Sequence, residues 1–546
     1  MARLMKSRLV CTLAAGSFFF GCAGHSRQAP SSDAALLAGM GSVHHPIATQ
    51  NAEAQRFFDQ GLALVYGFSF AEAVKSFSQA AHLDPKTPMP YWGMALANGP
   101  NYNAWTMGPA RREAALDAIR SALRLSANSP QPEQVYVKAL AQCYPAIPPA
   151  DPAQPLRDCA HALREVYQAY PDDADAAVLY AASLMTLSRR STDAPNLWTL
   201  EGKPGADTVE IVSVLEEVLR RWPDHIGANH FYIHAMEASP YPERALPSAH
   251  RLETLAPAAG HLVHMPSHIY LRTGAYSEAV KANQRAVEAD ERYLKEQPDG
   301  PGGGMSYFDH NFHYLAVAAN MDGEYQVAVD AARRLQTHAH SAALIAMPMV
   351  VLLRFARWDE LLALPEPHTE FAGVGFFWRY ARGFAYASKG KVDEALHERT
   401  AMEEEFAKLP PGRAFAVFFN DWNVVHSIAA DALDARIAAA RGDAGSAFKL
   451  WQAAAAVQDQ MNFDEVPDWY YPVRESWGAA LLRNGRFPQA EAVFREDLRR
   501  NPRNPRSLFG LGKALEGQNK SYEASWIHAA FAAAWKGEAP PRIEDF

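Results

Sequence analysis

The chain has 546 residues, of which 49% are hydrophobic and 21% charged, and 52 Lys and Arg stand against 61 Asp and Glu for a formal net charge of -9. So much apolar side chain excludes a globally disordered protein. The acidic balance argues against a nucleic-acid binder, which presents a basic surface to the phosphates. Four cysteines are too few for a small scaffold held together by disulfides.

The N-terminus has the order of an export signal. Three basic residues precede an apolar run over residues 9–20, and Gly21 and Cys22 follow it. A run of this length is too short for a membrane-spanning helix and suits a signal core. The Gly-Cys pair resembles the lipobox of bacterial lipoproteins. The two phenylalanines before it depart from that pattern and leave ordinary cleavage after Ala23 or Gly24 open. We expect residues 1–21 to be a lipoprotein signal and residues 22–43 a linker. The mature protein is then exported to the periplasm and touches the membrane only through a lipid on Cys22.

Two cysteines flank a proline-rich stretch. Cys143 and Cys159 lie on either side of residues 145–155. In an oxidising compartment they can form a disulfide across this loop, and the alternative is two separate buried thiols. Beyond the signal, no run of about 18 apolar residues predicts a membrane span.

The body of the chain repeats a helical-hairpin pattern. Large, small and helix-ending residues recur at the spacing of a tetratricopeptide repeat, a helix–turn–helix unit of about 34 residues. One copy near the start and one near the end carry the pattern at Phe57, Gly61, Ala73, Phe77, Ala80 and Pro85, and at Gly478, Gly485, Phe487, Ala490, Phe494 and Pro502. With degenerate copies between them, we predict an all-α fold, a right-handed superhelix of roughly nine or more stacked helix pairs. An N-terminal part would cover residues 44–340 and C-terminal repeats residues 341–546.

Histidine is concentrated in one stretch. Of the 20 histidines, nine lie between residues 225 and 313. Spacings of three and four residues place side chains on one face of a helix, with Cβ atoms ~5–6 Å apart. Imidazole is the commonest side-chain metal ligand. The histidines at these spacings are the predicted ligands, namely His230, His234, His261, His264, His268, His310 and His313.

The repeat register predicts that these pairs meet. The small residue of a second helix follows each of His230, His264 and His313 by fifteen positions. The three histidines therefore occupy one equivalent position on three first helices, which line the concave groove of such a superhelix. We expect the imidazoles to converge there and to hold metal. The alternative is a polar, pH-sensitive groove that binds an anionic ligand.

The surrounding residues favour copper among the transition metals, with zinc or iron as alternatives. Imidazole suits all three metals, and Met236 and Met265 add soft sulfur ligands nearby. Six or seven histidines are enough for two ions. The H-E-x-x-H helix of zinc peptidases is not present, because Phe231 and Met265 stand where its glutamate would be.

Two charged residues are the candidate catalytic groups. Glu237 lies near His234 and is predicted to act as a further ligand or a proton acceptor, or else to be an ordinary groove charge. Arg272 lies one turn after His268 and is predicted to bind a substrate carboxylate, or else to pair with Glu237.

Several motifs together resemble a group of exported bacterial tetratricopeptide-repeat proteins. They are YWGMA with GPN (residues 91–95 and 99–101), NHFYIH (residues 229–234), GHLVHMPSHIY (residues 260–270) and HNxH (residues 310–313). The resemblance covers residues 44–335, and beyond them only generic repeats support it. It implies the fold and the export of the chain, and it implies no reaction.

These patterns lead to one functional hypothesis and two alternatives. The first is an envelope protein whose groove holds a His-rich transition-metal site, with redox or hydrolytic activity on a small molecule. The alternatives are a non-catalytic scaffold that binds a peptide or partner protein in the groove, and a protein that stores or delivers metal. Imidazoles in the groove favour the first hypothesis, since peptide-binding arrays generally present Asn, Lys and Arg there.

Overall fold

The computed structural model describes residues 34–104, 106–190, 194, 196–296, 307–338, 342–367, 371–411 and 420–546. Within these ranges the chain is helical, and β structure is limited to two isolated bridges. None of the described helices is both long and apolar enough to cross a bilayer. The predicted signal over residues 1–21 and the lipid site at Cys22 lie outside the described residues.

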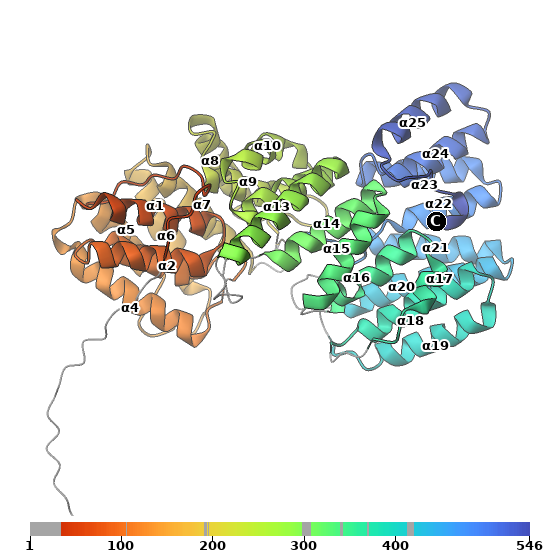
Figure 1. The fold of residues 1–546 in the computed structure, drawn as a ribbon, viewed down its shortest axis with the longest axis horizontal. Helices are drawn as coiled ribbons and strands as arrows, with labels where there is room; N and C mark the ends of the chain where they lie inside the picture. The colour runs from red at the N-terminus through yellow and green to blue at the C-terminus, as the bar shows by residue number, and fades with distance from the viewer. Residues whose placement is uncertain are drawn as a thin grey trace, which may run out of the picture.

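The helices follow one another as stacked pairs from α1 at one end of the molecule to α25 at the other (Figure 1). Those of the N-terminal part are α1 (Ala52–Tyr66), α2 (Phe70–Leu83), α3 (Met89–Asn98), α4 (Pro109–Leu125), α5 (Gln131–Ala141), α6 (Gln154–Ala169), α7 (Ala174–Ser188), α8 (Thr208–Arg221), α9 (Ile226–Glu237), α10 (Leu246–Leu255), α11 (Gly260–His264), α12 (Pro266–Thr273), α13 (Tyr276–Glu296), α14 (Phe308–Asp322) and α15 (Tyr325–His338). Those that follow are α16 (Ala342–Arg354), α17 (Trp358–Ala363), α18 (Val374–Ser388), α19 (Val392–Phe406), α20 (Trp422–Ala440), α21 (Ala444–Gln458), α22 (Val473–Arg483), α23 (Phe487–Arg500), α24 (Pro505–Glu516) and α25 (Ser521–Ala534). The predicted all-α superhelical array of helix pairs is confirmed.

An aromatic ring seated between two glycines explains why neighbouring pairs stack. Phe494 of α23 packs on Gly478 of α22 and Gly510 of α24, and a Cβ atom added to either glycine would lie within 2.5 Å of the ring. Phe77 of α2 makes the same contacts with glycines of α1 and α3. Because glycine has no side chain, the first helices of successive pairs come close enough to enclose the ring of the helix between them.

The turns inside the pairs require one residue with a left-handed backbone. Two positions before the second helix φ is positive, and glycine occupies this position in the turns at Gly274, Gly323, Gly390, Gly442 and Gly485. Glycine adopts that conformation without steric cost, whereas a residue with a side chain loses roughly 1–2 kcal/mol. In the turns before α2, α17 and α25 the residue is not glycine but Phe68, Ala356 and Asn519, with φ of 57°, 53° and 60°.

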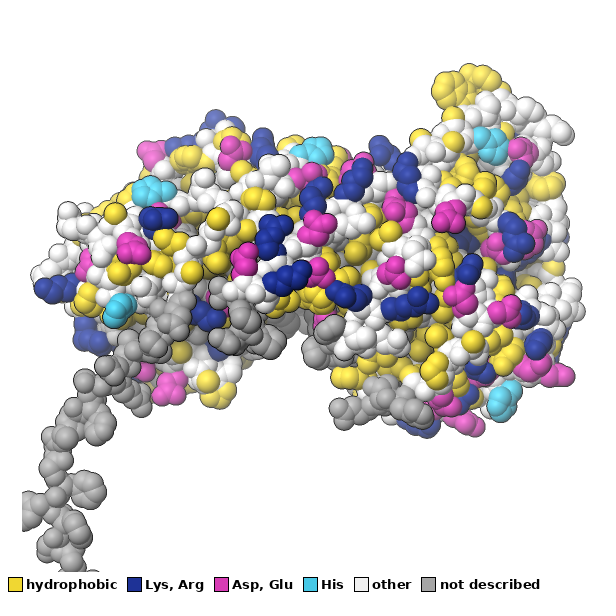
Figure 2. All heavy atoms as spheres, viewed as in Figure 1, with side chains coloured by type: hydrophobic (Ala, Val, Ile, Leu, Met, Phe, Trp, Pro, Cys, Tyr) yellow, Lys and Arg dark blue, Asp and Glu magenta, His cyan; other side chains and the backbone are white. Residues whose placement is uncertain are grey.

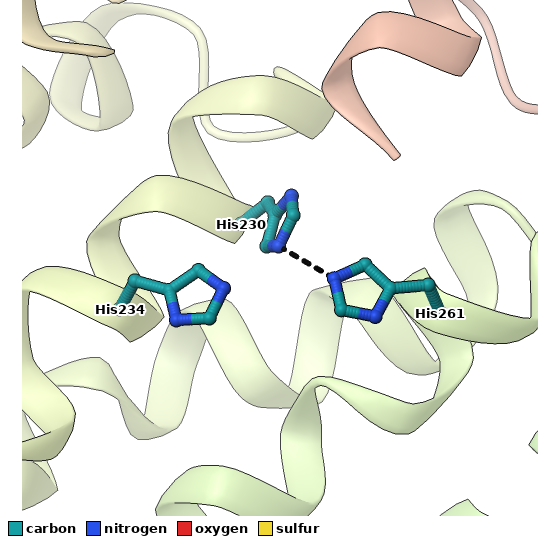
Figure 3. A group of neighbouring side chains, drawn as sticks. All are labelled: His230, His234 and His261. Atoms are coloured by element: carbon teal, nitrogen blue, oxygen red, sulfur yellow. Dashed lines mark hydrogen bonds between the residues drawn. The ribbon is translucent and has the colours of Figure 1, made fainter. Parts of the chain in front are cut away.

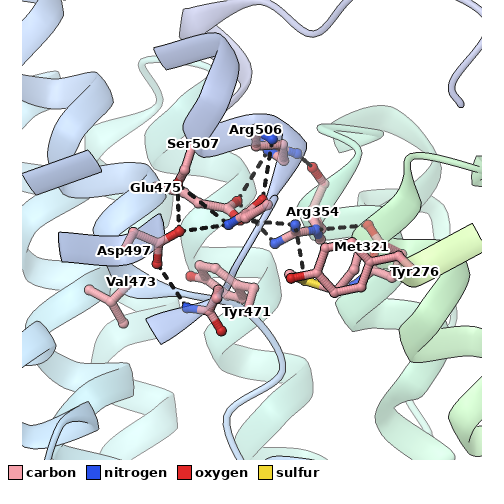
Figure 4. Close-up of polar contacts among 12 residues, drawn as sticks. Tyr276, Met321, Arg354, Tyr471, Val473, Glu475, Asp497, Arg506 and Ser507 are labelled. Atoms are coloured by element: carbon pink, nitrogen blue, oxygen red, sulfur yellow. Dashed lines mark hydrogen bonds and ion pairs between the residues drawn. The ribbon is translucent and has the colours of Figure 1, made fainter. Parts of the chain in front are cut away.

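Two further contacts hold the array together. A disulfide joins Cys143, just after α5, to Cys159 in α6, so the first of the two cysteine alternatives is the one found. At the other end Glu475 of α22 accepts hydrogen bonds at 3.0 and 2.9 Å from Arg354 of α16, and Arg506 of α24 lies 3.2 Å away (Figure 4). The side chains of Arg354 and Glu475 are 1% and 2% exposed. Removing one partner of such a buried pair generally costs about 3–5 kcal/mol, so this contact ties α22 and α24 to α16.

The hydrophobic core shows no break at residue 340. One continuous set of buried apolar residues runs from Met40 to Ala480, and a smaller set lies under α23 to α25. The division into parts at residue 340 stays a prediction, and the helices on both sides of it pack on one another.

The glycine contacts generate a stability prediction. Gly478→Ala should lower the thermal unfolding midpoint, because the added methyl group meets the Phe494 ring and overpacking costs about 1–3 kcal/mol. The matched control is Gly445→Ala, in an exposed first turn of α21 where the added Cβ meets only ordinary contacts. This control should leave the midpoint unchanged or raise it. Far-UV circular dichroism during heating measures both midpoints. Equal midpoints for the two variants would contradict the packing argument.

Candidate metal centre

Six of the seven predicted histidines converge in two groups. The first imidazole group is His230, His234 and His261, and the second is His264, His268 and His310. In each group one ring nitrogen per residue lies within 4.8 Å of the others. Figure 3 shows the first group, with its side chains extending from α9 and α11 toward one point. The groups adjoin, since the ring centroids of His234 and His268 are 5.4 Å apart.

In the first group a backbone carbonyl orients one ring. Nδ1 of His230 donates to the carbonyl oxygen of Tyr66 at 2.5 Å. Gly227, one turn earlier on α9, makes this approach possible, because a Cβ there would lie 2.5 Å from the Tyr66 ring. Nε2 of His230 then faces Nε2 of His261 at 3.2 Å.

In the second group an amide and a carboxylate orient the rings. Nδ1 of His264 donates at 2.6 Å to Oδ1 of Asn283, whose own NH₂ group is bonded to the carbonyl of Ala279. Nδ1 of His268 donates to Oε2 of Glu237. Pro266 separates α11 from α12 and cannot donate a backbone hydrogen bond, so the chain bends between the two histidines. Their Nε2 atoms lie 2.8 Å apart.

These hydrogen bonds decide which nitrogen of each ring is free. Nδ1 of His234 also donates to Glu237, through Oε1 at 2.9 Å. In His230, His234, His264 and His268 the proton of a neutral ring is therefore on Nδ1, and Nε2 carries the lone pair. Among the described residues, Nε2 of His234 is buried without a hydrogen-bond partner. Metal-binding histidines show this arrangement, with one nitrogen on an acceptor and the other facing the ion.

Burial keeps most of these rings neutral. It lowers the pKa of His230, His261, His264 and His310 well below 6.5, and the neighbouring imidazoles lower it further. His268 behaves in the opposite way. Burial lowers its pKa, but the charge and hydrogen bond of Glu237 outweigh burial and raise it. Neutral imidazole is the form that binds metal.

Glu237 links the two groups. Its carboxylate is 3% exposed and contacts His234 with one oxygen and His268 with the other. Burial alone would raise the pKa of Glu237, but the two imidazoles hold it well below its usual range. The carboxylate is therefore an anion that orients one ring of each group.

His313 lies outside both groups, contrary to the register argument. It follows His310 by three residues on α14. The ring of His310, not that of His313, lies edge-on to His264, with ring centroids 4.6 Å apart. Nε2 of His313 is buried without a partner, and burial lowers the pKa of His313 to about 3. The spacing matched the repeat positions correctly, but packing turns α14 so that the earlier histidine faces the centre.

The imidazoles are buried rather than displayed in an open groove. Five of the seven histidines are at most 3% exposed and His313 is 4% exposed, whereas the side chain of His310 is partly accessible at 27%. Aromatic rings cover the centre, with Phe68 at 4.5 Å from His230, Tyr102 at 5.0 Å from His234 and Tyr307 at 4.0 Å from His261. On the face in Figure 2, basic and acidic side chains are interspersed and the visible histidines are isolated.

A cavity of about 260 Å³ adjoins the second group and is closed by the distant segment between α21 and α22. In this segment Glu465 accepts at 2.8 Å from the Tyr314 hydroxyl through its carbonyl, and its carboxylate lies 3.7 Å from His310. Arg272 lines the cavity and donates to the backbone carbonyls of Glu237 at 2.8 Å and Ser239 at 3.3 Å.

Arg272 differs from the other arginines of this cavity. Arg474 and Arg500 both pair with Asp459, at 2.6 and 3.2 Å. Among the described residues, no carboxylate forms an ion pair with Arg272, so it does not pair with the Glu237 side chain. Burial lowers the pKa of Arg272. A half-buried guanidinium without a counter-ion suits an anionic ligand.

Apart from Glu237, sequence spacing did not identify the residues that orient or cover the rings. Asn283 lies one turn after the small residue Ala279, and Tyr314 one turn after His310, so both share a helix face with residues that were identified. Phe68 and Glu465 are far from the histidines in the chain, and no local pattern places them at the centre.

A second His/Asp cluster has different chemistry. Ligand atoms of His45, Asp173 and Asp175 also lie within 4.8 Å of one another. However, Asp175 accepts hydrogen bonds from His45, Tyr66 and His225, and Asp173 from a tyrosine and from backbone amides of α7. Because both oxygens of each carboxylate are satisfied, this cluster needs no ion.

No protein-family model matches the chain, and no curated protein does. Among solved structures, it is similar to one described as "Crystal structure of APC/C hetero-tetramer Cut9-Hcn1". The TM-score is 0.29 and the identity 11%, over 92% of this chain and 77% of that chain. A TM-score of this size carries no argument about assembly or function. The class of protein rests on the geometry of the chain itself, an all-α helical-repeat protein with a buried cluster of imidazoles.

The turn at Phe68 generates a prediction with an unusual sign. Phe68→Gly and Phe68→Ala both remove the ring beside the imidazoles, but only glycine tolerates the positive φ without strain. We expect the Gly variant to be more stable than the Ala variant by about 1 kcal/mol. The matched control is Phe70, in the first turn of α2, where Ala should be the more stable replacement. Thermal unfolding of the four variants measures both differences, and an Ala variant that is the more stable at both positions would refute strain at Phe68.

Proposed function

We propose that this chain is an exported helical-repeat metalloprotein that binds two transition-metal ions, one in each imidazole group, and acts on a small molecule by redox chemistry or hydrolysis. The observation that carries the proposal is the orientation of the rings. Four buried imidazoles have Nδ1 committed to an acceptor, so their Nε2 lone pairs face one another or, at His234, face no protein donor.

Facing ring nitrogens in a buried site need a proton or a metal ion between them. A proton on His268 can satisfy its contact with His264, because Glu237 favours the charged form. In the first group a neutral His261 with its proton on Nε2 can donate to His230, but among the described residues this leaves Nδ1 of His261 and Nε2 of His234 without a partner. A metal ion satisfies one nitrogen of each of the three rings of a group while all three rings stay neutral.

The number of donors favours catalysis over a purely structural role. Each group offers three nitrogens. Structural zinc sites generally have four protein ligands, whereas catalytic sites have three and leave a position for water or substrate. Both oxygens of Glu237 are engaged by imidazole N–H groups, which supports a positioning role for this residue over that of ligand or proton acceptor.

Three imidazoles suit copper, zinc or iron. Copper is the metal to test first, with zinc and iron as alternatives. Met236 and Met265, which the sequence offers as soft ligands, are buried in the hydrophobic core, so the case for copper rests on the imidazoles. The disulfide between Cys143 and Cys159 supports export, because such bonds persist in oxidising compartments.

Arg272 and its cavity support a small anionic substrate. The guanidinium retains N–H groups beyond those bonded to the carbonyls of Glu237 and Ser239, and it lines the same cavity as His268. A carboxylate or phosphate bound to Arg272 would lie beside the second group. The alternative functions are a scaffold for a peptide or partner protein and a protein that stores or delivers metal.

Elemental analysis of protein purified without a His-tag tests the metal proposal. We expect about two equivalents of copper, zinc or iron, one for each group. His264→Ala/His268→Ala should lose the ion of the second group and keep the other, and His230→Ala/His261→Ala should do the reverse. Glu237→Gln should weaken both sites about 10–100-fold, because it orients a ring in each.

The control is the double variant His44→Ala/His161→Ala. The side chains that it removes are 65% and 75% exposed, and the variant should leave the metal content unchanged. Folded protein that stays metal-free after equilibration with each ion would return the chain to the scaffold class. Rapid loss of bound metal to a mild chelator would favour storage or delivery over catalysis.

Anion binding by the metal-loaded protein tests the role of Arg272. Arg272→Gln should raise the dissociation constants of acetate and inorganic phosphate about 10–100-fold, since a hydrogen bond to a charged group contributes about 1.5–3 kcal/mol. Its metal content should not change. Arg120→Gln, at an exposed position, is the control and should bind both anions normally. Titration calorimetry measures the constants, and equal values for the two variants would remove Arg272 from the site.

A further inference from the structure

A second cavity, of about 80 Å³, lies next to the first imidazole group and is apolar. It is formed by residues of α1 to α3, α5 to α7 and α9, and all the described residues that line it are uncharged. The hydroxyls of Tyr144, Ser183 and Thr186 are already used, because they donate to backbone carbonyls at 2.7, 2.6 and 2.8 Å. Beyond the Asn101 amide and the indole N–H of Trp92, which has no partner among the described residues, such a lining offers little to water. Apolar cavities of this kind stay dry and take up apolar molecules.

Two aromatic residues form the wall between this cavity and the metal centre. Phe68 and Tyr102 line the cavity and also lie 4.5 and 5.0 Å from the rings of His230 and His234. The cavity is therefore one ring away from the nitrogens proposed to hold the first ion.

The backbone at Phe68 adds an independent observation. The equivalent turn position is glycine in five other turns and Ala356 or Asn519 in two more, and in this turn a bulky phenylalanine adopts the left-handed conformation. Strained residues persist where the surrounding structure holds them, and they are concentrated at ligand and active sites. The chain accepts this strain at the one turn whose side chain stands between the cavity and His230.

We propose that this cavity is a binding site for a small apolar molecule or group, which it places beside the first metal ion. A cavity of about 150 Å³ holds benzene. At about 80 Å³ this one suits a diatomic gas such as dioxygen or a short alkyl group of an organic substrate. That the occupant reacts at the ion rests on the proposed function, but binding in the cavity does not require metal.

Xenon and short alcohols are the probes. In crystals of the full protein under xenon pressure, we expect one xenon site between Phe68 and Leu140, in metal-free and metal-loaded protein alike. A series from ethanol to pentanol, followed by thermal shift, distinguishes the two sources. Xenon binding with no rise of the unfolding temperature in any alcohol indicates a gas-sized ligand. A rise of the unfolding temperature that is largest for a short-chain alcohol indicates an alkyl group.

Filling the cavity provides the matched variants. Ala182→Leu and Ser183→Leu place additional methyl groups in the cavity and should reduce xenon occupancy at least 5-fold with unchanged metal content. Ala529→Leu, on the exposed face of α25, is the control and should bind xenon normally. Two cavity-filling variants are used so that the test remains possible if one of them does not fold.

Absence of xenon and of alcohol binding in the folded wild-type protein would overturn this proposal and leave the metal proposal standing. Xenon binding in a protein that takes up no metal would overturn the metal proposal alone. Xenon binding unchanged in both folded Leu variants would show that the xenon site is elsewhere and would also overturn the assignment.

Discussion

The carboxylate of Glu237 is the interaction on which the centre depends. It accepts Nδ1–H from His234 on its own helix, α9, and from His268 on α12, so one buried anion orients a ring in each imidazole group. Burying a charge is costly unless it is paired, and here the pairing also decides which nitrogen of each ring stays free. The two groups therefore share one orienting residue, which is why we expect a change at Glu237 to affect both ions.

A ligand site differs from a structural hydrogen-bond network in having polar atoms that no protein group satisfies. Around Asp175 the carboxylate is satisfied by His45, Tyr66 and His225, and the cluster joins the segment before α1 to α7 and α9. In four of the histidines, protein partners occupy Nδ1, namely in His230, His234, His264 and His268. Nε2 of three of them faces another imidazole, and Nε2 of His234 has no partner among the described residues. Both clusters place three potential ligands equally close together, so proximity by itself does not separate them.

The C-terminal helices contribute to the site as well as extending the array. The buried pair of Arg354 and Glu475 fixes α22 against α16, and the segment just before α22 carries Glu465 to Tyr314 and His310. This segment lines the cavity that holds Arg272. The apolar cavity is formed by the N-terminal helices alone. A repeat array usually binds along an open groove, whereas here turns and loops cover the imidazoles.

The sequence by itself determined the all-α repeat, the glycine and aromatic positions that stack the helices, and the histidines from His230 to His310 that converge. Those features are periodic, and a period of 3.6 residues inside a repeat of fixed length relates side chains to one another without further information. Only the tertiary structure decided that His310 rather than His313 faces the centre, that Phe68 and Glu465 reach it, and that the rings are buried. The rotation of a helix about its axis and the path of a distant loop depend on packing of the whole chain, which no local spacing records.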